Sequence, residues 1–332
     1  MQTILIAGVL NQPFGSWPAA SQSNDGQLWT QASSPFSTND FCTALATDGT
    51  TAAVSNQRGY LSTTTDMTNW VQTVINDGFG TTDLAQSVDA NSYPHWIAVG
   101  SYNYVNGYGP YPPKTSVAQI YRSNSATEGW HMVWTHPLNG SEFYQVSYFA
   151  LSPITDVLQA DVWVAVGSNG AGGGDVYYSL DYGISWVQAP IPAGAGTIYS
   201  VGTYQLDGTT VWLYGSSGKI FISSTLNSVQ WNEVELNSGD NIIGITSNET
   251  GSMVLNGVNN LYITFNGLEY STFNQLGYVF NRVLTFSYDS KYRWLAFARS
   301  TLTQFTYWLS DDLITWSSGN NGIEVQGTST NS

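Results

Sequence analysis

The residues best suited to recognition chemistry are the tyrosines of one long stretch, Ser101 to Lys114. This stretch carries Tyr102, Tyr104, Tyr108 and Tyr111, with Asn and Gly between them. A tyrosine ring offers a flat face on which sugar C–H groups stack and a hydroxyl that hydrogen-bonds, at little cost in side-chain entropy. The stretch therefore predicts a surface that binds a glycan or a partner protein. The alternative is a proline-stiffened loop that packs on its neighbour or on another subunit.

Further candidate ligand residues are aromatic side chains, arginines and a glycine-rich loop in other parts of the chain. We expect them to lie near the tyrosine stretch once the chain is folded. They are Phe14, Trp17, Arg58, Arg299 and the loop from Gly170 to Gly174.

Four acidic residues could support a different chemistry, the hydrolysis of a glycosidic bond. A glycosidase needs two carboxyl groups across the scissile bond, and Asp83, Glu142, Asp175 and Asp240 fall in segments expected near the same surface. With 23 acidic residues in the chain, simple solvation is the alternative explanation. A hydrolase is therefore the second hypothesis, after a binding protein.

No other catalytic, metal or cofactor site is predicted. The three histidines, His95, His131 and His136, stand beside Trp or Pro without Ser or Asp partners that the sequence can place, so no triad is argued. The single cysteine, Cys42, lies in an apolar run, which predicts a buried, inert thiol and no disulfide. The Gly-rich loop lacks the Lys-Ser/Thr and the helix of a phosphate-binding loop.

Composition narrows the choice of partner. Only 9% of residues are charged, and 8 Lys and Arg against 23 Asp and Glu give a net charge of -15. With so few basic residues, the sequence predicts no basic surface that would bind nucleic acid or anionic lipid. The N-terminal run Met1 to Leu10 has no basic start and is too short to span a bilayer, so we expect neither a signal peptide nor a membrane segment.

The element that must position these residues is a short repeat, most complete at Ser179 to Trp186. Its pattern is Ser or Thr, any residue, then Asp, Asn or Ser, and, after three or four intervening residues, an aromatic. Such a repeat predicts a hairpin turn in which the small polar side chain accepts backbone N–H bonds and the aromatic starts the returning strand. The other copies are Ser23/Asp25/Trp29, Thr64/Asp66/Trp70, Ser123/Ser125/Trp130, Thr225/Asn227/Trp231, Thr264/Asn266/Tyr270 and Ser310/Asp312/Trp316.

The seven copies recur about every 48 residues and fill the 332-residue chain. Each is preceded by a buried-strand run such as Trp96 to Gly100 or Trp163 to Gly167, and further upstream by a strand that ends in a tight turn. This predicts one all-β domain over residues 1–332, a seven-bladed β-propeller of four-stranded antiparallel blades. The first blade lacks its first strand, and Gly322 to Gln326 is the available piece to close the ring beside the N-terminal strand.

The stretch from Ser179 to Trp186 keeps every position of the Asp-box motif, Ser/Thr-x-Asp-x-Gly-x-x-Trp, so the chain resembles the Asp-box (BNR repeat) β-propellers, which include sialidases. The resemblance implies that these turns are structural and that ligands bind on the opposite face, where the tyrosine stretch belongs. Sialidases also need three converging arginines. Arg122 and Arg293 are expected on the turn side or at an edge, so no sialidase site is predicted.

These observations favour a non-enzymatic propeller that recognises a glycan or a partner protein. We expect a virion surface component, such as a phage tail or capsid appendage, assembled into a larger particle. The Ser-, Thr-, Asn- and Gly-rich surface with few charges motivates that setting. The alternatives are a glycoside hydrolase with a carboxylate pair at the channel mouth and a secreted, extracellular lectin or adhesin.

Overall fold

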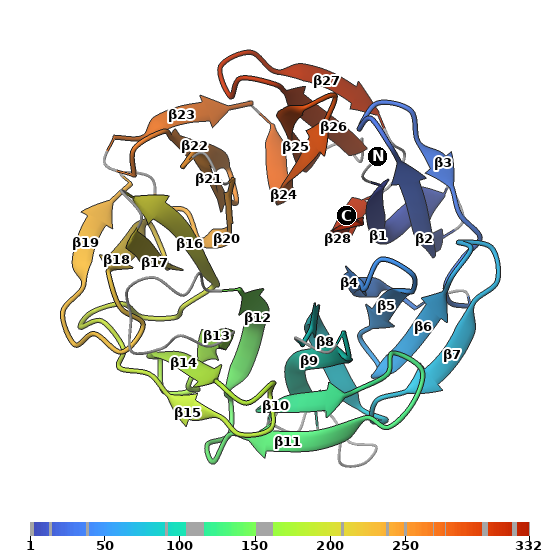
Figure 1. Ribbon diagram of the computed structural model, residues 1–332, viewed down its shortest axis with the longest axis horizontal. Coiled ribbons are helices and arrows are strands. Elements are labelled where there is room, and N and C mark those ends of the chain that lie inside the picture. The colour runs from blue at the N-terminus through green and yellow to red at the C-terminus, as the bar shows by residue number, and fades with distance from the viewer. Residues whose placement is uncertain are drawn as a thin grey trace.

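In the computed structural model, 28 strands form seven four-stranded antiparallel sheets, arranged as the blades of a ring (Figure 1). No helix occurs among the described residues. The predicted seven-bladed propeller is therefore confirmed. The structure describes residues 3–12, 15–37, 40–89, 92–103, 116–150, 162–206, 209–236, 239–248, 251–267, 269–275, 277–300, 305–320 and 324–331.

Each blade runs outward from the central opening through four strands, called A to D here. Blade 1 consists of β28 (Glu324–Asn331), β1 (Thr3–Gln12), β2 (Gly15–Ser23) and β3 (Thr30–Gln31). Blade 2 consists of β4 (Cys42–Thr47), β5 (Ala52–Asn56), β6 (Tyr60–Thr64) and β7 (Val71–Val74). Blade 3 consists of β8 (Phe79–Val88), β9 (Pro94–Asn103), β10 (Ser116–Ser123) and β11 (His131–Thr135).

The remaining blades repeat this order. Blade 4 consists of β12 (Glu142–Phe149), β13 (Val162–Ser168), β14 (Gly174–Ser179) and β15 (Val187–Gln188). Blade 5 consists of β16 (Ser200–Leu206), β17 (Thr209–Gly215), β18 (Lys219–Ser223) and β19 (Asn232–Glu235). Blade 6 consists of β20 (Ile242–Ser247), β21 (Met253–Gly257), β22 (Asn260–Thr264) and β23 (Ser271–Asn274). Blade 7 consists of β24 (Tyr278–Tyr288), β25 (Lys291–Ser300), β26 (Phe305–Ser310) and β27 (Ser317–Asn320).

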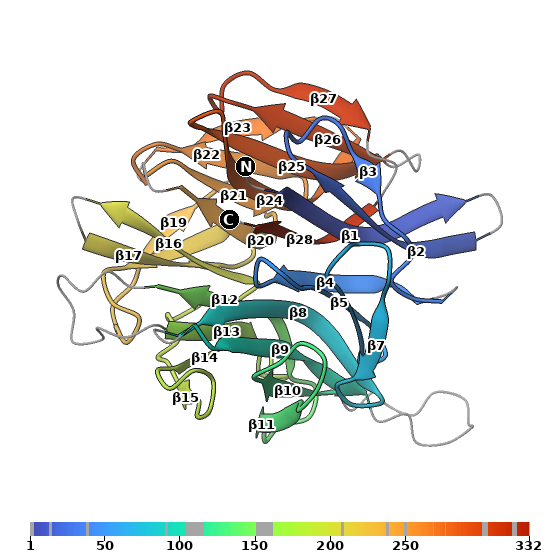
Figure 2. The ribbon, with the colours of Figure 1, turned by 45° about the vertical axis from the view of Figure 1, so that its right-hand side comes forward.

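The ring closes where the C-terminal strand β28 pairs antiparallel with β1, with Thr3 opposite Asn331 and Val9 opposite Glu324. Both views place the two chain ends close together at this seam (Figures 1 and 2). The predicted closure is therefore confirmed, and the strand runs further than predicted, to Asn331. Closure covers the edge of β1 that would otherwise be unpaired.

The hydrophobic core is divided into seven clusters, and each lies between two neighbouring blades. The predicted buried B strands supply its largest members: Trp96 and Trp163 are 0% exposed and Trp212 is 3% exposed. The aromatic anchor of each turn packs against the cluster shared with the preceding blade, as Trp186 does with blade 3. Burial between blades is therefore what holds adjacent sheets together.

The predicted turns join strand C to strand D in every blade. Each begins with a Ser or Thr whose hydroxyl oxygen accepts a backbone N–H of its own turn. In blade 1, Asp25 Oδ1 accepts two more, from Gln27 and Leu28, both at 2.8 Å. Gly26 adopts a φ of 75°, the left-handed region that such a turn needs at this position.

The sequence assignment was wrong for the turn of blade 5. Strand β18 ends at Ser223, and the Ser223 hydroxyl accepts the N–H of Thr225 at 3.2 Å. The turn therefore starts at Ser223, two residues before the predicted Thr225, and Thr225 occupies the position predicted for Asn227. The misassignment arose because Thr225 and Asn227 also satisfy the pattern by themselves.

Candidate functional site

The two faces of the ring differ in their connections. The A–B and C–D connections lie on one side, here called the turn face. The B–C and D–A connections lie on the other side, here called the loop face. On the turn face the seven C–D connections repeat one kind of turn, although the A–B connections differ in length. On the loop face, both the B–C and the D–A connections differ in length and sequence from blade to blade. Unequal loops on a regular scaffold are where binding residues usually lie.

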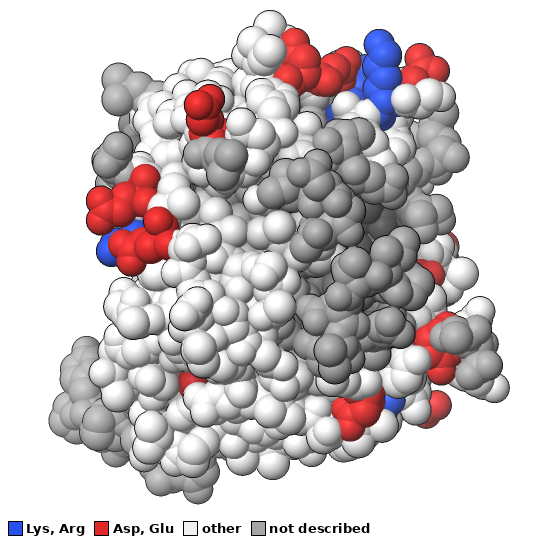
Figure 3. All heavy atoms as spheres, turned by 60° about the vertical axis from the view of Figure 1, so that its left-hand side comes forward, with Lys and Arg blue, Asp and Glu red and all other residues white. Residues whose placement is uncertain are grey.

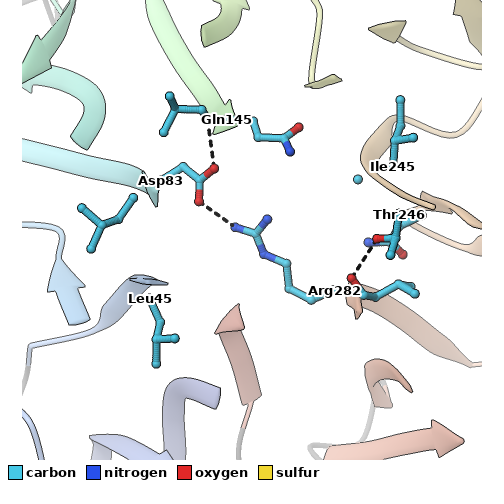
Figure 4. Close-up of a pocket in the computed structure, with 11 residues that line it drawn as sticks. Leu45, Asp83, Gln145, Ile245, Thr246 and Arg282 are labelled. Carbon is cyan, nitrogen blue, oxygen red and sulfur yellow. Dashed lines mark hydrogen bonds and ion pairs between the residues drawn. The ribbon is translucent and has the colours of Figure 1, made fainter. Parts of the chain in front are cut away.

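The innermost strands surround a central cavity of about 210 Å³. Asp83 of β8 and Arg282 of β24 extend toward each other from opposite sides of the ring (Figures 1 and 4), with Arg282 Nη2 3.8 Å from Asp83 Oδ1. Asp83 Oδ2 also accepts the Val146 N–H of the next blade at 3.0 Å. Burial raises the pKa of Asp83, and the Arg282 charge opposes that shift.

A recurring β-bulge sets the position of these channel side chains. Strands β8, β12 and β24 each shift register by one residue, and the residues that follow the shift are Asp83, Gln145 and Arg282. Gln145 Oε1 accepts the Val201 N–H of blade 5 at 2.9 Å, as Asp83 does with blade 4. These residues thus occupy equivalent places in three blades, and the first two also link their blade to the next one.

The interface between blades 3 and 4 contains a buried histidine–carboxylate pair that sequence reasoning missed. His136 follows strand β11, and its Nε2 lies 2.7 Å from Asp175 Oδ2 of β14; the two side chains are 4% and 2% exposed. His136 Nδ1 accepts the Leu138 N–H at 2.9 Å, so the proton is on Nε2. Gln188 donates to the other Asp175 oxygen at 2.9 Å. Because both His136 nitrogens are engaged, the pair holds the D–A connection of blade 3 against strand β14 of blade 4 and is not arranged to activate a nucleophile.

The remaining predicted carboxylates also have internal partners. Asp240 is 3% exposed and accepts from the side chain of Asn259 at 2.6 Å and from the Tyr262 hydroxyl at 3.2 Å. Glu142 Oε2 accepts the Tyr144 hydroxyl at 3.1 Å. Each of the four candidate acids therefore contributes to the contacts between strands, loops or blades.

The tyrosine stretch begins differently from the prediction. Strand β9 extends to Asn103, so Tyr102 lies in the strand, paired with Phe79 and Val117, and packs half-buried against the core of blades 2 and 3. Tyr104, Tyr108 and Tyr111 lie outside the described residues. Strand β9 ends, and strand β10 begins, at the loop face. Two other half-buried rings, those of Tyr144 and Tyr199, lie on the loop face, and their centroids are 5.3 Å apart.

The other candidates belong to three neighbouring blades, 7, 1 and 2. Arg58 is 60% exposed and pairs with Asp40 of the preceding blade, with Nε 3.2 Å from Oδ1. Arg299 is exposed in β25. Trp17 lies in β2 opposite Leu10, and its side chain lies outside the described part, as does the whole of Phe14. Because Phe14 and the side chain of Trp17 lie outside the described residues, the shared site stays a prediction.

The glycine-rich loop is ordered by a single side chain. Asn169 Oδ1 accepts the N–H groups of Ala171 and Gly173, at 2.9 and 3.0 Å. A Cβ on Gly170 would lie 2.5 Å from the Asn139 carbonyl oxygen, so this loop packs closely against the D–A connection of blade 3. Its described contacts assign it a structural role.

The arginines expected on the turn face lie there. Arg122 Nε donates to the Tyr182 carbonyl at 2.8 Å, and Arg293 donates to the Asp25 carbonyl at 3.2 Å. Both fasten a turn of the following blade. Among the described residues, no group of three or more His, Cys, Asp or Glu could hold a metal ion, and no helix is long and apolar enough to cross a membrane.

The surface view agrees with the composition. Figure 3 shows a side of the molecule on which charged residues gather in small groups near the margin, while most of the described surface between them is uncharged. Recognition of a ligand here must therefore rely on hydrogen bonds, stacking and shape.

No protein-family model matches the chain, and no curated protein sequence matches it. Solved structures do match, 558 chains in all, so this shape is widely shared. One of them is described as "YCF48 bound to D1 peptide"; it is 13% identical, with a TM-score of 0.55 over 88% of each chain. At this identity the likeness shows the fold alone, a β-propeller.

Proposed function

We propose that this propeller is a non-enzymatic binding module that recognises a glycan through its loop face. The observation that carries the proposal is the contrast between the two faces. The C–D connections of the turn face repeat one hydrogen-bonded turn, which we assign to the Asp-box type. On the loop face neither kind of connection repeats, and Tyr102, Tyr144 and Tyr199 lie at or beside its strand ends. Tyrosine rings and amide side chains suit an uncharged sugar better than they suit a charged polymer.

The internal partners of the acidic residues support a binding role over hydrolysis. A glycosidase acid must be free to reach the glycosidic oxygen, and its partner must reach the sugar or a water. Asp175 and Asp240 are 2% and 3% exposed and are held by neighbouring side chains. Glycoside hydrolysis therefore remains the weaker alternative.

A partner protein is the second candidate ligand. The similar structure is described as YCF48 bound to a D1 peptide, so a propeller of this shape can take a peptide. For the present chain we propose a place on the surface of a virus particle, or an extracellular one, where it would belong to a larger assembly. The low charge and the Ser-, Thr-, Asn- and Gly-rich composition support that setting.

A glycan array tests the proposal. We expect the wild type to bind a defined subset of glycans. One or two of the changes Tyr102→Ala, Tyr104→Ala, Tyr108→Ala and Tyr111→Ala should weaken binding about 30-fold or more, since binding energy concentrates in a few aromatic anchors. The matched control is Tyr93→Ala, because Tyr93 is 65% exposed in the A–B connection of the same blade, on the turn face. Glycan binding that survives all four changes would reject the loop as the recognition surface.

The same glycans separate binding from hydrolysis. We expect no cleavage of any bound glycan by the wild type. If cleavage occurs, the paired changes Asp83→Asn/Glu142→Gln and Asp175→Asn/Asp240→Asn show whether a carboxylate pair is responsible. Turnover that a folded pair variant abolishes would place the hydrolase ahead of the binding module.

A further inference from the structure

Three connections of the loop face meet at a cluster of aromatic and polar side chains between blades 4 and 5. Glu142 follows the D–A connection of blade 3 and pairs with Ser168, which ends β13 where the B–C connection of blade 4 begins. Tyr199 ends the D–A connection of blade 4, and its ring lies 5.3 Å from that of Tyr144 in β12. All four residues are partly exposed, so a ligand on the loop face can reach them.

A β-bulge places Tyr144 in this cluster. Phe143 pairs with Gly167 and Gln145 pairs with Val166, and Tyr144 between them has no partner in the ladder. Bulges change the direction of a side chain and are frequent beside binding sites. Five other innermost strands carry the same irregularity, and their unpaired residues are Gln326, Thr43, Thr82, Ile243 and Asn281. An aromatic ring at this place is therefore particular to blade 4 and is not required by the fold.

The tyrosine hydroxyl fixes the carboxylate of the cluster. Tyr144 donates its O–H to Glu142 Oε2 at 3.1 Å. Burial raises the pKa of Tyr144 above its ordinary value, although a hydrogen bond with Ser168 opposes that shift, so the hydroxyl keeps its proton at neutral pH. A carboxylate offers roughly four acceptor positions, so Glu142 can accept further hydrogen bonds from a ligand while it holds Tyr144.

The chemistry of the cluster restricts the ligand. A carboxylate only accepts hydrogen bonds, so it suits adjacent hydroxyl groups and repels a second carboxylate. The tyrosine rings offer apolar surface for the C–H groups of a sugar ring. The cluster therefore favours a sugar that carries hydroxyl groups and no acidic group.

We propose that the cluster of Glu142, Tyr144, Ser168 and Tyr199 is a glycan subsite for a neutral pyranose. Two adjacent sugar hydroxyls donate to Glu142, and the sugar ring packs on the tyrosines. The inference rests on the proposed function, because it assigns residues and a sugar class to glycan recognition by the loop face. The three residues that contact each other directly belong to neighbouring segments of β12 and β16, so one sugar unit can span them (Figure 1).

Matched neutral and acidic sugars test the class of ligand. On a glycan array, followed by calorimetry at low ionic strength, we compare glucosides and galactosides with the corresponding uronic acids, in which a carboxylate replaces the C6 alcohol. The uronic acids should bind about tenfold more weakly than their neutral counterparts. Binding confined to acidic glycans would overturn the subsite and leave glycan recognition standing, whereas an array without any bound glycan would overturn both.

Variants locate the subsite on the molecule. Glu142→Gln keeps an oxygen that can accept the Tyr144 hydroxyl but loses the charge. It should weaken binding of the neutral sugar about tenfold and bring the preference over the uronic acid to about threefold or less, an effect that a purely structural role would not produce. Glu128→Gln is the matched control, because it removes the same charge from an exposed position on the turn face, and it should change neither quantity.

A second variant removes the flat ring and keeps apolar bulk between the blades. Tyr199→Leu should stay folded by circular dichroism and weaken binding of the neutral sugar about tenfold or more. Glycan binding by the wild type that is unchanged in folded Glu142→Gln and Tyr199→Leu proteins would refute this subsite without touching the proposed function.

Discussion

Removing the imidazole of the buried His136–Asp175 pair should destabilise the propeller strongly. In His136→Leu, Asp175 would lose the contact of 2.7 Å to Nε2 while remaining 2% exposed. Removing the hydrogen-bonded partner of a buried carboxylate costs about 3 to 5 kcal/mol, because the remaining charge stays buried without compensation. Leu138 would also lose the acceptor for its N–H.

The expected change in Tm follows from the length of the chain. An unfolding entropy of about 2.1 cal/mol/K per residue over 332 residues gives roughly 0.7 kcal/mol/K. The loss should therefore lower the Tm by about 4 to 7 °C, measured by calorimetry and by urea titration.

Two further variants separate loss of charge compensation from loss of packing. His136→Leu/Asp175→Asn carries no buried charge and should be more stable than His136→Leu alone. His131→Leu is the matched control, because His131 is exposed, and its effect should stay within about 0.5 kcal/mol. A His136→Leu protein that loses less than about 1 kcal/mol would show that the pair does not hold blades 3 and 4 together.

Three other predictions concern closure and the turns. Deleting residues 324–332 removes the inner strand of blade 1 and should lower the Tm by about 10 °C or more, since β1 gains an open edge; an unchanged Tm would rule out the closure. In urea titrations, Asp181→Ala should cost about 1 to 2 kcal/mol through lost turn hydrogen bonds, and Trp186→Ala about 3 to 5 kcal/mol through a cavity between blades; equal costs would contradict this ranking. Asp312 has its pKa lowered to about 2 by hydrogen bonds from the N–H groups of its own turn, so its contribution is complete above the ordinary pKa of 3.8 and is lost as the pH falls through about 2. The stability difference between wild type and Asp312→Asn should therefore close between pH 4 and pH 2, and a constant difference would refute the assignment.

The fold could be predicted from the sequence because the same short-range sequence signals occur in every blade. A small hydroxyl residue at the end of strand C, an aromatic after the turn and an apolar run in strand B are all short-range signals. These signals recur seven times. Assigning the turn of blade 5 to Thr225 in place of Ser223 therefore does not change the number of predicted blades. Closure by the C-terminal strand followed from the same counting, because one blade lacked a strand.

The candidate site could be predicted only in part, because it depends on contacts between blades. Asp83 was recognised only as one of four candidate acidic residues, and Arg282 was not among the candidate residues. Their shared position after a β-bulge depends on strand register, which the sequence pattern does not reveal. The partner of His136 was missed for a related reason: Asp175 is 39 residues away and belongs to the next blade.

The central claim, that ligand recognition occurs on the loop face, is tested most directly by blocking each face in turn. Cys42 is the only cysteine and is 1% exposed, so an introduced cysteine can be modified selectively with a bulky maleimide–polyethylene glycol. Asp77→Cys places the label on the loop face, next to Gly78, where a Cβ would lie 3.1 Å from the Tyr102 ring. Thr68→Cys places the same label on the turn face of the same blade, and both positions are exposed. Binding to the glycan identified on the array should be lost when position 77 is labelled and kept when position 68 is labelled. Binding that is kept with the label at 77, or lost with the label at 68, would contradict the account.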